Sequence, residues 1–319
     1  MEKKRQANLL AIAKILQDIR TRILNGECPQ LPLPSRPLKL QGGAPIRDIK
    51  RFTCIVKLLK IIEVNICGNV ISTKRDIFYR DISLFGSQQY VDSLIQQVQL
   101  MLNCERLSLN IVASPKGLVC GDMTIYQEDE ISIDIKGITL IPVAPEILFI
   151  RFNRPVDFVL VVEKEAVFRN MCIAFPNAIV ITGKGVPDYI TRKLICIISR
   201  CHPDIPIYTL VDADPYGLQI VFTYQTGGIK ADQERKSLAL SSIKFLGASI
   251  IDYRDESLPA TVNDRRKAMS LLKMGVTKGL QREVQLQLFI CRKAELNVLN
   301  NTDSVQLHNY VKRKLTTKY

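Results

Sequence analysis

Apolar residues near the start of the chain recur at alternating steps of three and four, which is the spacing of a helix with one apolar seam. Residues 29–45, PQLPLPSRPLKLQGGAP, contain five prolines and two glycines and predict an extended linker. We therefore expect residues 1–45 to be a helix and a linker, with the seam docked on a partner chain. The alternative is that the helix folds back onto the next domain. The seam residues are Leu9, Ile12, Leu16, Ile19 and Ile23.

Residues 46–145 show the pattern helix, turn, short helix, longer helix and then two strands. Thr73 and Asp76 have the spacing of a capping box that opens the short helix. The two strands, LSLNIVA and GLVCGDMTIY, alternate around the turn SPKG. This order predicts a winged helix-turn-helix, a shape that docks on DNA. The apolar faces of the two longer helices are Ile55, Leu58, Leu59 and Ile62, and Val91, Leu94, Ile95, Val98 and Leu102.

Residues 146–319 contain short, continuously apolar runs, each followed by a polar turn and a helical segment. Buried parallel strands with crossover helices have this pattern. We therefore expect a small α/β domain here, which gives the whole chain a mixed α+β and α/β class. The runs are DFVLVVEKEAVF, AIVITGKGVPDYITRKLICIIS and IYTLVDADPYGLQIVFTY.

The composition narrows the class of protein. The 319 residues include no apolar run near the roughly 18 residues of a membrane span, and the charged amino-terminal segment lacks a small-residue cleavage site. Nine cysteines form no CxxC pair, and the only histidines are His202 and His308. We expect a soluble chain without a secretory signal, with reduced thiols, in an intracellular compartment and without a zinc site.

The formal net charge of +13 indicates a polyanionic partner, most often nucleic acid, although a solvated basic surface has the same composition. The charge is uneven along the chain. Residues 230–319 hold 17 Lys and Arg against 9 acidic residues, whereas residues 51–229 hold 17 against 18. The middle of the chain therefore keeps carboxylates despite a polyanionic partner.

Three carboxylates follow predicted parallel strands. Ligands gather at the carboxyl ends of such strands, and these ends carry Glu163, Asp212 and Asp214. Carboxylates without a neighbouring histidine or cysteine favour a hard cation such as Mg²⁺. The alternative for Asp214, which precedes Pro215, is a helix N-cap followed by a favoured first helical residue.

The turn TGKG, residues 182–185, is not an ATP-binding Walker A loop. Ala178 stands where the first glycine is required, and Gly185 replaces the serine or threonine after Lys184. We expect no ATP hydrolysis. A Gly-Lys-Gly turn can hold a DNA phosphate through backbone N–H groups and its lysine, and a plain tight turn is the alternative.

Four motifs in this order resemble one family: STKRDIFYRDISLFGSQ, VVEKEAVF, TGKGVPD and LVDADPYG. The chain resembles the meiotic double-strand-break transesterases known as sporulation protein eleven, relatives of the A subunit of topoisomerase VI. The resemblance extends from about Arg47 to the end of the chain, and the segment before it matches only in general character. It implies a winged-helix (CAP-like) domain followed by a Toprim domain in a nuclear protein that initiates meiotic recombination.

The resemblance implies that Tyr79 is the nucleophile, because the preceding aromatic position is Phe78. Its oxygen attacks a DNA phosphodiester to leave a 5′-phosphotyrosyl bond and a free 3′-hydroxyl. Arg75, one helical turn earlier, is well placed to stabilise the phosphoryl oxygens. Without the resemblance, a packing role is the commoner one for such a tyrosine.

The resemblance also matches Glu163, Asp212 and Asp214 to the acidic set of the Toprim fold, which holds Mg²⁺. Lys184 corresponds to a turn near the DNA backbone. We expect Lys74, Arg75, Lys116 and Lys184 to contact double-stranded DNA. The family acts as a homodimer in which the tyrosine of one protomer works with the metal site of the other. The amino-terminal helix would dock on a transducer-like, topoisomerase VI B-type subunit.

Other functions fit parts of the sequence. A topoisomerase VI A subunit would relax DNA with an ATPase partner, and the short chain and the wording KRDIFYRD favour the meiotic role over it. A noncatalytic winged-helix regulator would not require Tyr79 together with all three acids. A Toprim nuclease or primase would keep the acids and have no use for the tyrosine.

Overall fold

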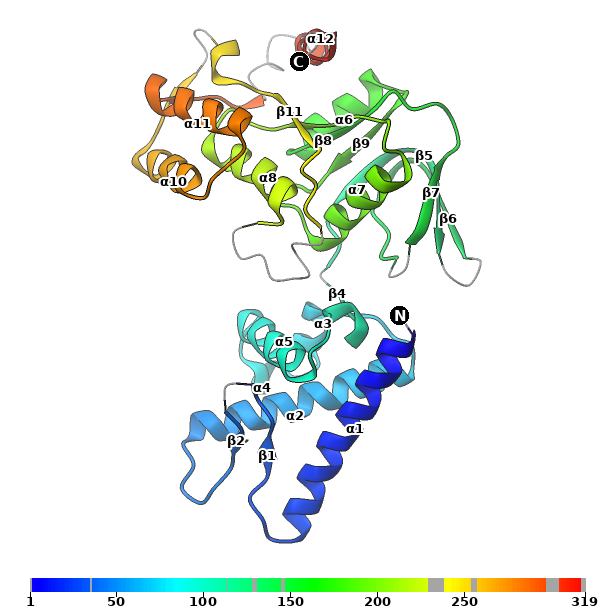
Figure 1. Cartoon of the computed structure of the whole chain (residues 1–319), viewed down its shortest axis with the longest axis vertical. Coiled ribbons are helices and arrows are strands. Elements are labelled where there is room, and N and C mark those ends of the chain that lie inside the picture. Colours follow the sequence, from blue (N-terminus) through cyan, green and yellow to red (C-terminus); the bar gives the residue numbers. More distant parts are fainter. Residues whose placement is uncertain are drawn as a thin grey trace. The chain divides into compact units, whose positions relative to one another are not determined.

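The computed structural model of the chain describes residues 2–34, 36–112, 114–127, 131–144, 147–228, 238–253, 257–296 and 304–316. The chain divides into two compact units, Met1–Ser114 and Pro115–Tyr319. In Figure 1 the first unit runs from blue to cyan-green and the second from green to red. Within the described residues no helix has the length and apolar character that a membrane span requires.

The first unit is mainly helical. A two-residue antiparallel pair joins β1 to β2, and a two-residue parallel pair joins β3 to β4. Its elements are α1 (Glu2–Leu24), β1 (Gln30–Leu31), β2 (Leu38–Lys39), α2 (Ile46–Cys67), β3 (Ser72–Thr73), α3 (Lys74–Tyr79), α4 (Ile82–Phe85), α5 (Gln88–Leu102), the 3₁₀ helix η1 (Arg106–Leu109) and β4 (Ile111–Val112).

Side-chain caps fix where the helices after α2 begin. Thr73 and Asp76 form the predicted capping box of α3: the Asp76 N–H donates to the Thr73 hydroxyl at 3.2 Å, and the Thr73 N–H donates to Asp76 Oδ2 at 2.8 Å. Asp81 caps α4 and Ser87 caps α5. The predicted order of helix, turn, short helix and longer helix is confirmed.

The predicted exposed seam of α1 is wrong. Ile12 is 0% exposed and Ile19 is 6% exposed, and both belong to one core with the apolar face of α2. Leu9 and Leu16 pack against this core, whereas Ile23 is 58% exposed. An apolar seam must be covered by something, and the nearest cover is the chain's own helix α2. The alternative that the helix folds back onto its own chain is therefore the correct one.

The predicted extended linker after α1 is also wrong. Leu31, Leu33 and Leu38 are buried in the same core, and the β1–β2 pair lies within this segment. The prolines prevent this segment from forming a helix, but they do not prevent its leucine side chains from being buried. Residues 1–45 therefore belong to the first folded unit.

The two predicted wing strands do not pair with each other. Residues 106–109 form η1 instead of a strand, and the short β4 pairs with β3. The second predicted strand is β5 (Leu118–Gln127), which pairs with three strands of the second unit. The structure thus divides the chain at residues 114 and 115, where we expected a boundary after residue 145.

The second unit is built on one mixed sheet. Its strand order is β11-β10-β8-β9-β5-β6, and β7 also pairs with β5. The strands β8, β9 and β10 are parallel as predicted, β11 is a further parallel strand beside β10, and β5 runs antiparallel to β9. The strands are β6 (Ser132–Leu140), β7 (Ile147–Phe152), β8 (Phe158–Val162), β9 (Ala178–Thr182), β10 (Ile207–Leu210) and β11 (Lys244–Gly247), with a small pair of β12 (Leu258–Pro259) and β13 (Arg292–Lys293).

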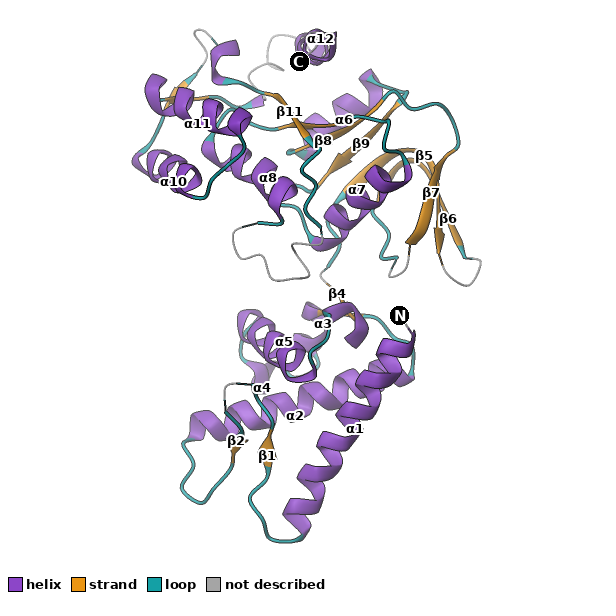
Figure 2. Cartoon of the chain, viewed as in Figure 1, coloured by secondary structure: helices purple, strands orange, loops and turns teal. Residues whose placement is uncertain are grey.

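Helices cover both faces of this sheet (Figure 2). Along β8, Val159 and Val161 pack into one core while Leu160 and Val162 pack into the other, because successive side chains of a strand point to opposite faces. The first core includes residues of α7 (Tyr189–Cys201), α8 (Pro215–Thr226), α10 (Val262–Lys273) and α11 (Lys278–Ile290); the second includes residues of α6 (Glu165–Ala174), the 3₁₀ helix η3 (Ile250–Asp252) and α12 (Ser304–Thr316).

Candidate active site and metal centre

Tyr79 is the last residue of α3 and is 60% exposed. The fully buried Ile77 anchors this six-residue helix in the core, and the Phe78 and Tyr79 rings lie 5.4 Å apart. Arg75 is exposed one helical turn before Tyr79. Within the described residues, neither the Tyr79 hydroxyl nor the Arg75 guanidinium makes a hydrogen bond or an ion pair. Both groups are therefore open to a large ligand.

Arg80 ties the end of α3 to the rest of its unit. Its Nη2 donates to Asn65 Oδ1 at 3.0 Å and to Ser72 Oγ at 3.2 Å, and Asn65 is fully buried on α2. No pattern in the sequence indicates this role, because Asn65 lies within an apolar helical run. These two bonds fix the backbone next to Tyr79.

The other predicted DNA-contacting lysines already have partners. Lys74 pairs with Asp92 at 2.8 Å, so a carboxylate compensates its charge. Lys116 Nζ donates to the Lys184 carbonyl at 3.2 Å, and Lys184 Nζ lies 2.8 Å from Glu165 Oε2. The structure thus brings Lys116 and Lys184 together.

The Gly-Lys-Gly turn is held at the strand edge that carries Glu163. The Gly185 N–H donates to the Glu163 carbonyl at 2.9 Å, and the Thr182 hydroxyl donates to the same oxygen at 3.2 Å. Lys184 and Gly185 have φ angles of 51° and 87°, in the left-handed region that glycine tolerates best. This conformation turns the chain back beside the end of β8.

The three predicted carboxylates do follow neighbouring strands. Glu163 comes directly after β8, and Asp212 and Asp214 come after β10, which is the parallel neighbour of β8. The Asp212 N–H donates to Glu163 Oε2 at 3.0 Å, which joins the two strand ends. The sequence therefore placed these acids correctly at one edge of the sheet.

Asp214 has the helix-capping role that the sequence allowed. Its Oδ1 accepts hydrogen bonds from the N–H groups of Tyr216 at 2.9 Å and Gly217 at 2.7 Å, at the start of α8. Within the described residues its Oδ2 has no hydrogen-bond partner. The capping role therefore leaves one carboxylate oxygen for a ligand.

Burial and mutual repulsion shape the electrostatics of this edge. Burial raises the pKa of Glu163, and the nearby charges of Asp212 and Asp214 add to the effect, so that the pKa reaches about 7 although the Asp212 N–H lowers it. Burial also raises the pKa of Asp214, and the charge of Asp212 adds to the effect. Three crowded acids of this kind are stabilised by a cation.

A glycine permits this close packing. A Cβ atom on Gly217 would lie 2.5 Å from the Asp212 carbonyl oxygen and 3.2 Å from Glu163 Oε2. The Asp212 nitrogen also borders this space, at 3.1 Å, and the carboxylate oxygens of the edge fit a hard cation such as Mg²⁺. The part of the chain that the structure describes contains no three His, Cys, Asp or Glu side chains already grouped as metal ligands.

Lys164 and Leu296, which the sequence did not single out, contact the Asp212 carboxylate, and Glu295 contacts Lys164. Lys164 Nζ lies 2.8 Å from Asp212 Oδ2 and 2.9 Å from Glu295 Oε2, and the Leu296 N–H donates to Asp212 Oδ1 at 2.9 Å. Glu295 is distant in sequence, and only its place beside the strand edge brings it here. Both oxygens of Asp212 therefore already contact groups of its own chain.

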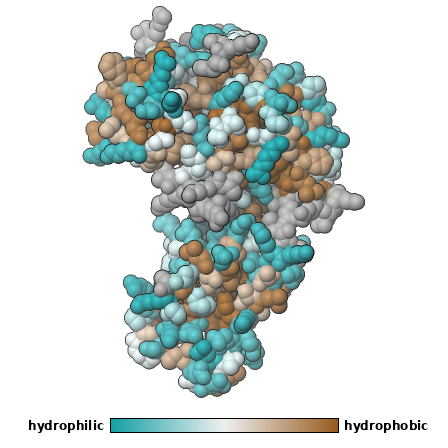
Figure 3. Space-filling model, viewed as in Figure 1, coloured by the Kyte–Doolittle hydropathy of each residue, from teal (hydrophilic) through white to brown (hydrophobic). Residues whose placement is uncertain are grey.

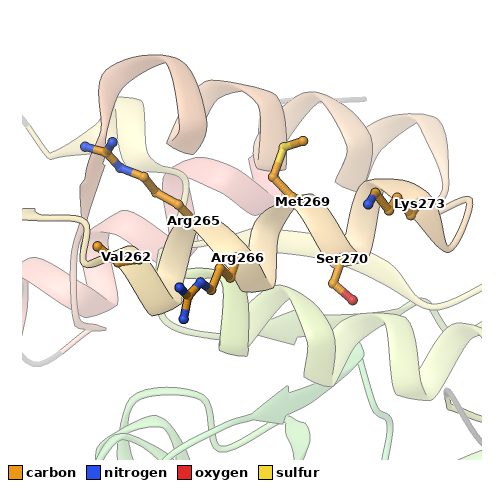
Figure 4. Close-up of a pocket in the computed structure, with 6 residues that line it drawn as sticks. All are labelled: Val262, Arg265, Arg266, Met269, Ser270 and Lys273. Carbon is orange, nitrogen blue, oxygen red and sulfur yellow. The ribbon is translucent and has the colours of Figure 1, made fainter.

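The face of α10 carries positive charge that the sequence did not distinguish. A shallow hollow of about 440 Å³ lies on this face, and Figure 4 shows the side chains of α10 that line it. Arg265, Arg266 and Lys273 line it, and within the described residues no carboxylate pairs with them. The surface over α10 and α11 mixes hydrophilic and hydrophobic residues in Figure 3. Beside it, Lys267 Nζ lies 5.8 Å from the centre of the Tyr216 ring, two residues after Asp214.

Comparison with known proteins defines the class of protein. Residues 158–315 match the family model for the Toprim domain shared by the topoisomerase 6 A protein and Spo11, and residues 50–111 match "Type IIB DNA topoisomerase". The mixed sheet with acids at its edge is thus a Toprim domain, and the chain is a type IIB DNA topoisomerase-like, DNA-cleaving enzyme.

Similar proteins cover most of the chain. It is 32% identical to the human "Meiotic recombination protein SPO11", over 96% of this chain and 87% of that protein. It is 31% identical to "Meiotic recombination protein rec12" of Schizosaccharomyces pombe, over 82% of this chain and 77% of that protein. It is 30% identical to the A subunit of DNA topoisomerase 6 of Arabidopsis thaliana, over 82% of this chain and 65% of that protein. The chain belongs to the family of Spo11 and the topoisomerase 6 A proteins.

Proposed function

We propose that the chain breaks double-stranded DNA by transesterification and so initiates meiotic recombination. The Tyr79 oxygen forms a bond to a DNA phosphorus, and the bond from that phosphorus to the 3′ oxygen breaks. The phenolic proton is lost and the leaving 3′ oxygen gains one, so a 5′-phosphotyrosyl link and a 3′-hydroxyl result. The observation that carries the proposal is an exposed phenol, at the end of a firmly anchored helix, in a chain of this family.

Arg75 is the group that we assign to the phosphoryl oxygens. A guanidinium that has no partner in the described residues is available to a phosphate, and a fixed positive charge stabilises the charge that develops in the transition state. The cations at the α10 hollow, together with Lys116 and Lys184, supply further contacts to the DNA backbone. Lys74 and Lys184 contribute less, because Asp92 and Glu165 compensate their charges.

Glu163, Asp212 and Asp214 are the residues that would hold Mg²⁺. When bound, the ion supplies positive charge to the DNA backbone and to the leaving 3′ oxygen. Support comes from the all-oxygen donor set, the free Oδ2 of Asp214 within the described residues, and the raised pKa of Glu163. Asp214 holds its carboxylate in place through the first N–H groups of α8.

The active form in this proposal is a homodimer in the nucleus. Each protomer contributes one tyrosine to one strand, and the tyrosine of one protomer works with the acids of the other. A B-type subunit like that of topoisomerase VI is the expected protein partner. The names of the relatives support a role in meiotic recombination.

A second candidate function is that of a topoisomerase VI A subunit that relaxes DNA with an ATPase partner. The similarity to plant proteins named as topoisomerase 6 subunits favours it. Relaxation of supercoiled DNA by the chain with such a partner would support this function. Breaks that remain unsealed would support the meiotic one.

The test of the proposal is covalent capture of end-labelled DNA. Tyr79→Phe removes one hydroxyl and should abolish the adduct while folding and noncovalent DNA binding stay at the wild-type level. Tyr126→Phe makes the same chemical change in a tyrosine of β5 that stacks on Phe149 at 4.3 Å, and it should retain the adduct. An adduct of normal yield with Tyr79→Phe would refute the assignment.

A further inference from the structure

We propose that Lys164 is an internal counter-ion that competes with the divalent metal for Asp212, and that Glu295 retains the Lys164 ammonium when the metal binds. This inference deepens the proposed metal site and depends on it. It concerns two residues of this chain and is independent of whether Tyr79 is the nucleophile.

The backbone fixes Lys164 at the acidic edge. Lys164 directly follows Glu163 at the end of β8 and is the residue before the first turn of α6. Its Nζ lies 2.8 Å from Asp212 Oδ2 and 2.9 Å from Glu295 Oε2. The Asp212 side chain is only 7% exposed, whereas that of Glu295 is 55% exposed. The ammonium therefore bridges a buried carboxylate and an accessible one.

A metal that binds Asp212 does so at or beside the oxygen that this ammonium contacts, and the two cations repel each other. Asp212 Oδ1 already accepts the Leu296 N–H at 2.9 Å, and the buried Leu296 anchors that contact. The remaining oxygen, Oδ2, is the one that Lys164 contacts. Since a hard cation also seeks carboxylate oxygen, the two cations compete for the same atom.

Glu295 is placed to hold Lys164 after it leaves Asp212. On one side of Glu295, Ala294 exchanges two backbone hydrogen bonds with Ala213, at 2.9 and 3.1 Å. On the other side, Leu296 donates to Asp212. Both neighbours of Glu295 are therefore tied to the strand edge, and its carboxylate stays within reach of Lys164. The ammonium keeps one ionic partner during the exchange, which makes its displacement less unfavourable.

The experiment is a titration of the full chain with Mn²⁺, without DNA, followed by electron paramagnetic resonance of the free ion. Asp212→Asn should weaken binding and so identify the site. Lys164→Met should tighten Mn²⁺ binding on the order of tenfold, because a charge a few ångströms from an ionic site shifts its equilibrium by about that factor or more. Lys164→Arg keeps the charge and should stay close to wild type.

Glu295→Gln separates the two roles. In the wild-type background it should weaken Mn²⁺ binding several-fold, because Lys164 then has Asp212 as its remaining partner. In the Lys164→Met background the same change should alter binding less than about twofold, since non-additivity marks residues that act through each other. Arg169→Met removes a charge from the same helix, where Arg169 pairs with Glu165 at 2.7 Å, and should change binding less than about twofold.

Three results would overturn the proposal. If Lys164→Met binds Mn²⁺ no more tightly than the wild type, Lys164 does not compete with the metal. The same conclusion holds if neither protein binds the ion. An equal effect of Glu295→Gln in both backgrounds shows that Glu295 acts on the metal directly. A Lys164→Arg variant that binds as tightly as Lys164→Met shows that the charge is not the cause. Thermal unfolding of each variant shows whether it is folded. If DNA capture fails while the expected changes in Mn²⁺ binding are observed, Tyr79 is refuted as the nucleophile and the competition between Lys164 and the metal is still supported.

Discussion

The tyrosine end of α3 and the acidic edge of the sheet hold their functional groups in different ways. Tyr79 projects from a short helix that is anchored through Ile77 and Arg80, and the structure leaves its ring exposed. At the acidic edge, backbone N–H groups donate hydrogen bonds to the Glu163 and Asp212 carboxylates, and Lys164 forms an ion pair with Asp212. A nucleophile for a polymer must be reachable, whereas acids that bind a small ion gain from burial and fixed geometry. The consequence for the acids is a raised pKa at Glu163.

The largest expected effect concerns the core that supports the tyrosine. Ile19→Asp places a charge on the buried face of α1 and should lower the free energy of unfolding by about 3 kcal/mol or more. Ile23→Asp, on the exposed side of the same helix, should change it by less than about 0.5 kcal/mol. Urea denaturation measures both. Equal stabilities would show that α1 is not part of this core.

A second prediction concerns how the stability of the chain depends on pH through the acidic edge. The pKa of Glu163, about 7, lies above the unperturbed 4.5, so between these values the folded chain keeps a proton that the unfolded chain has released. The free energy of unfolding should therefore fall as the pH rises from about 4.5 to 7, by at most about 3.5 kcal/mol at 1.4 kcal/mol per pKa unit.

Metal-free urea denaturation between pH 5 and 8 measures this slope. Glu163→Gln should remove its component. Glu165 is the matched control, because hydrogen bonds from Lys184 and Arg169 lower its pKa. Its contribution to stability is lost only as the pH falls below about 4.5, so Glu165→Gln should leave the slope between pH 5 and 8 unchanged. A Glu163→Gln variant with an unchanged slope would contradict the assignment of the raised pKa.

A third prediction tests the close packing at the acidic edge. Gly217→Ala brings a Cβ within 2.5 Å of the Asp212 carbonyl oxygen and should cost about 1 to 3 kcal/mol of stability, with weaker Mn²⁺ binding. Gly279→Ala on α11 meets no atom within 4 Å and should be neutral or gain up to about 1 kcal/mol. Calorimetry of the two variants checks the difference. Retention of stability by Gly217→Ala would mean that the edge is looser than described.

The smallest stability effect separates two arginines near Tyr79. Arg80→Ala loses its bonds to Asn65 and Ser72 and should cost about 1.5 kcal/mol. Arg75→Ala should change stability by less than about 0.5 kcal/mol, yet slow adduct formation on the order of 10² to 10³-fold. Urea denaturation and single-turnover capture of DNA measure the two quantities. A normal adduct rate for Arg75→Ala would remove it from the chemistry.

Local signals in the sequence predicted several features of the fold and the site. The capping box of Thr73 and Asp76 fixed the start of α3, because both partners lie within one helical turn. The apolar runs of β8, β9 and β10 predicted parallel buried strands, and Glu163, Asp212 and Asp214 followed at their shared edge. Each of these inferences uses residues that are close in sequence or strands whose direction the crossovers dictate.

The sequence alone determined that α1 has an apolar seam and that β5 is a strand, whereas only the tertiary structure decided what each one contacts. The seam packs against α2, and β5 joins the sheet of the second unit. Burial and strand pairing depend on which surfaces of other elements lie next to them in the folded chain. The contact of Lys164 with Glu295 spans 131 positions, and that of Arg80 with Asn65 joins the residue after α3 to the preceding helix α2. No local pattern encodes such contacts, since they exist only once the chain has folded.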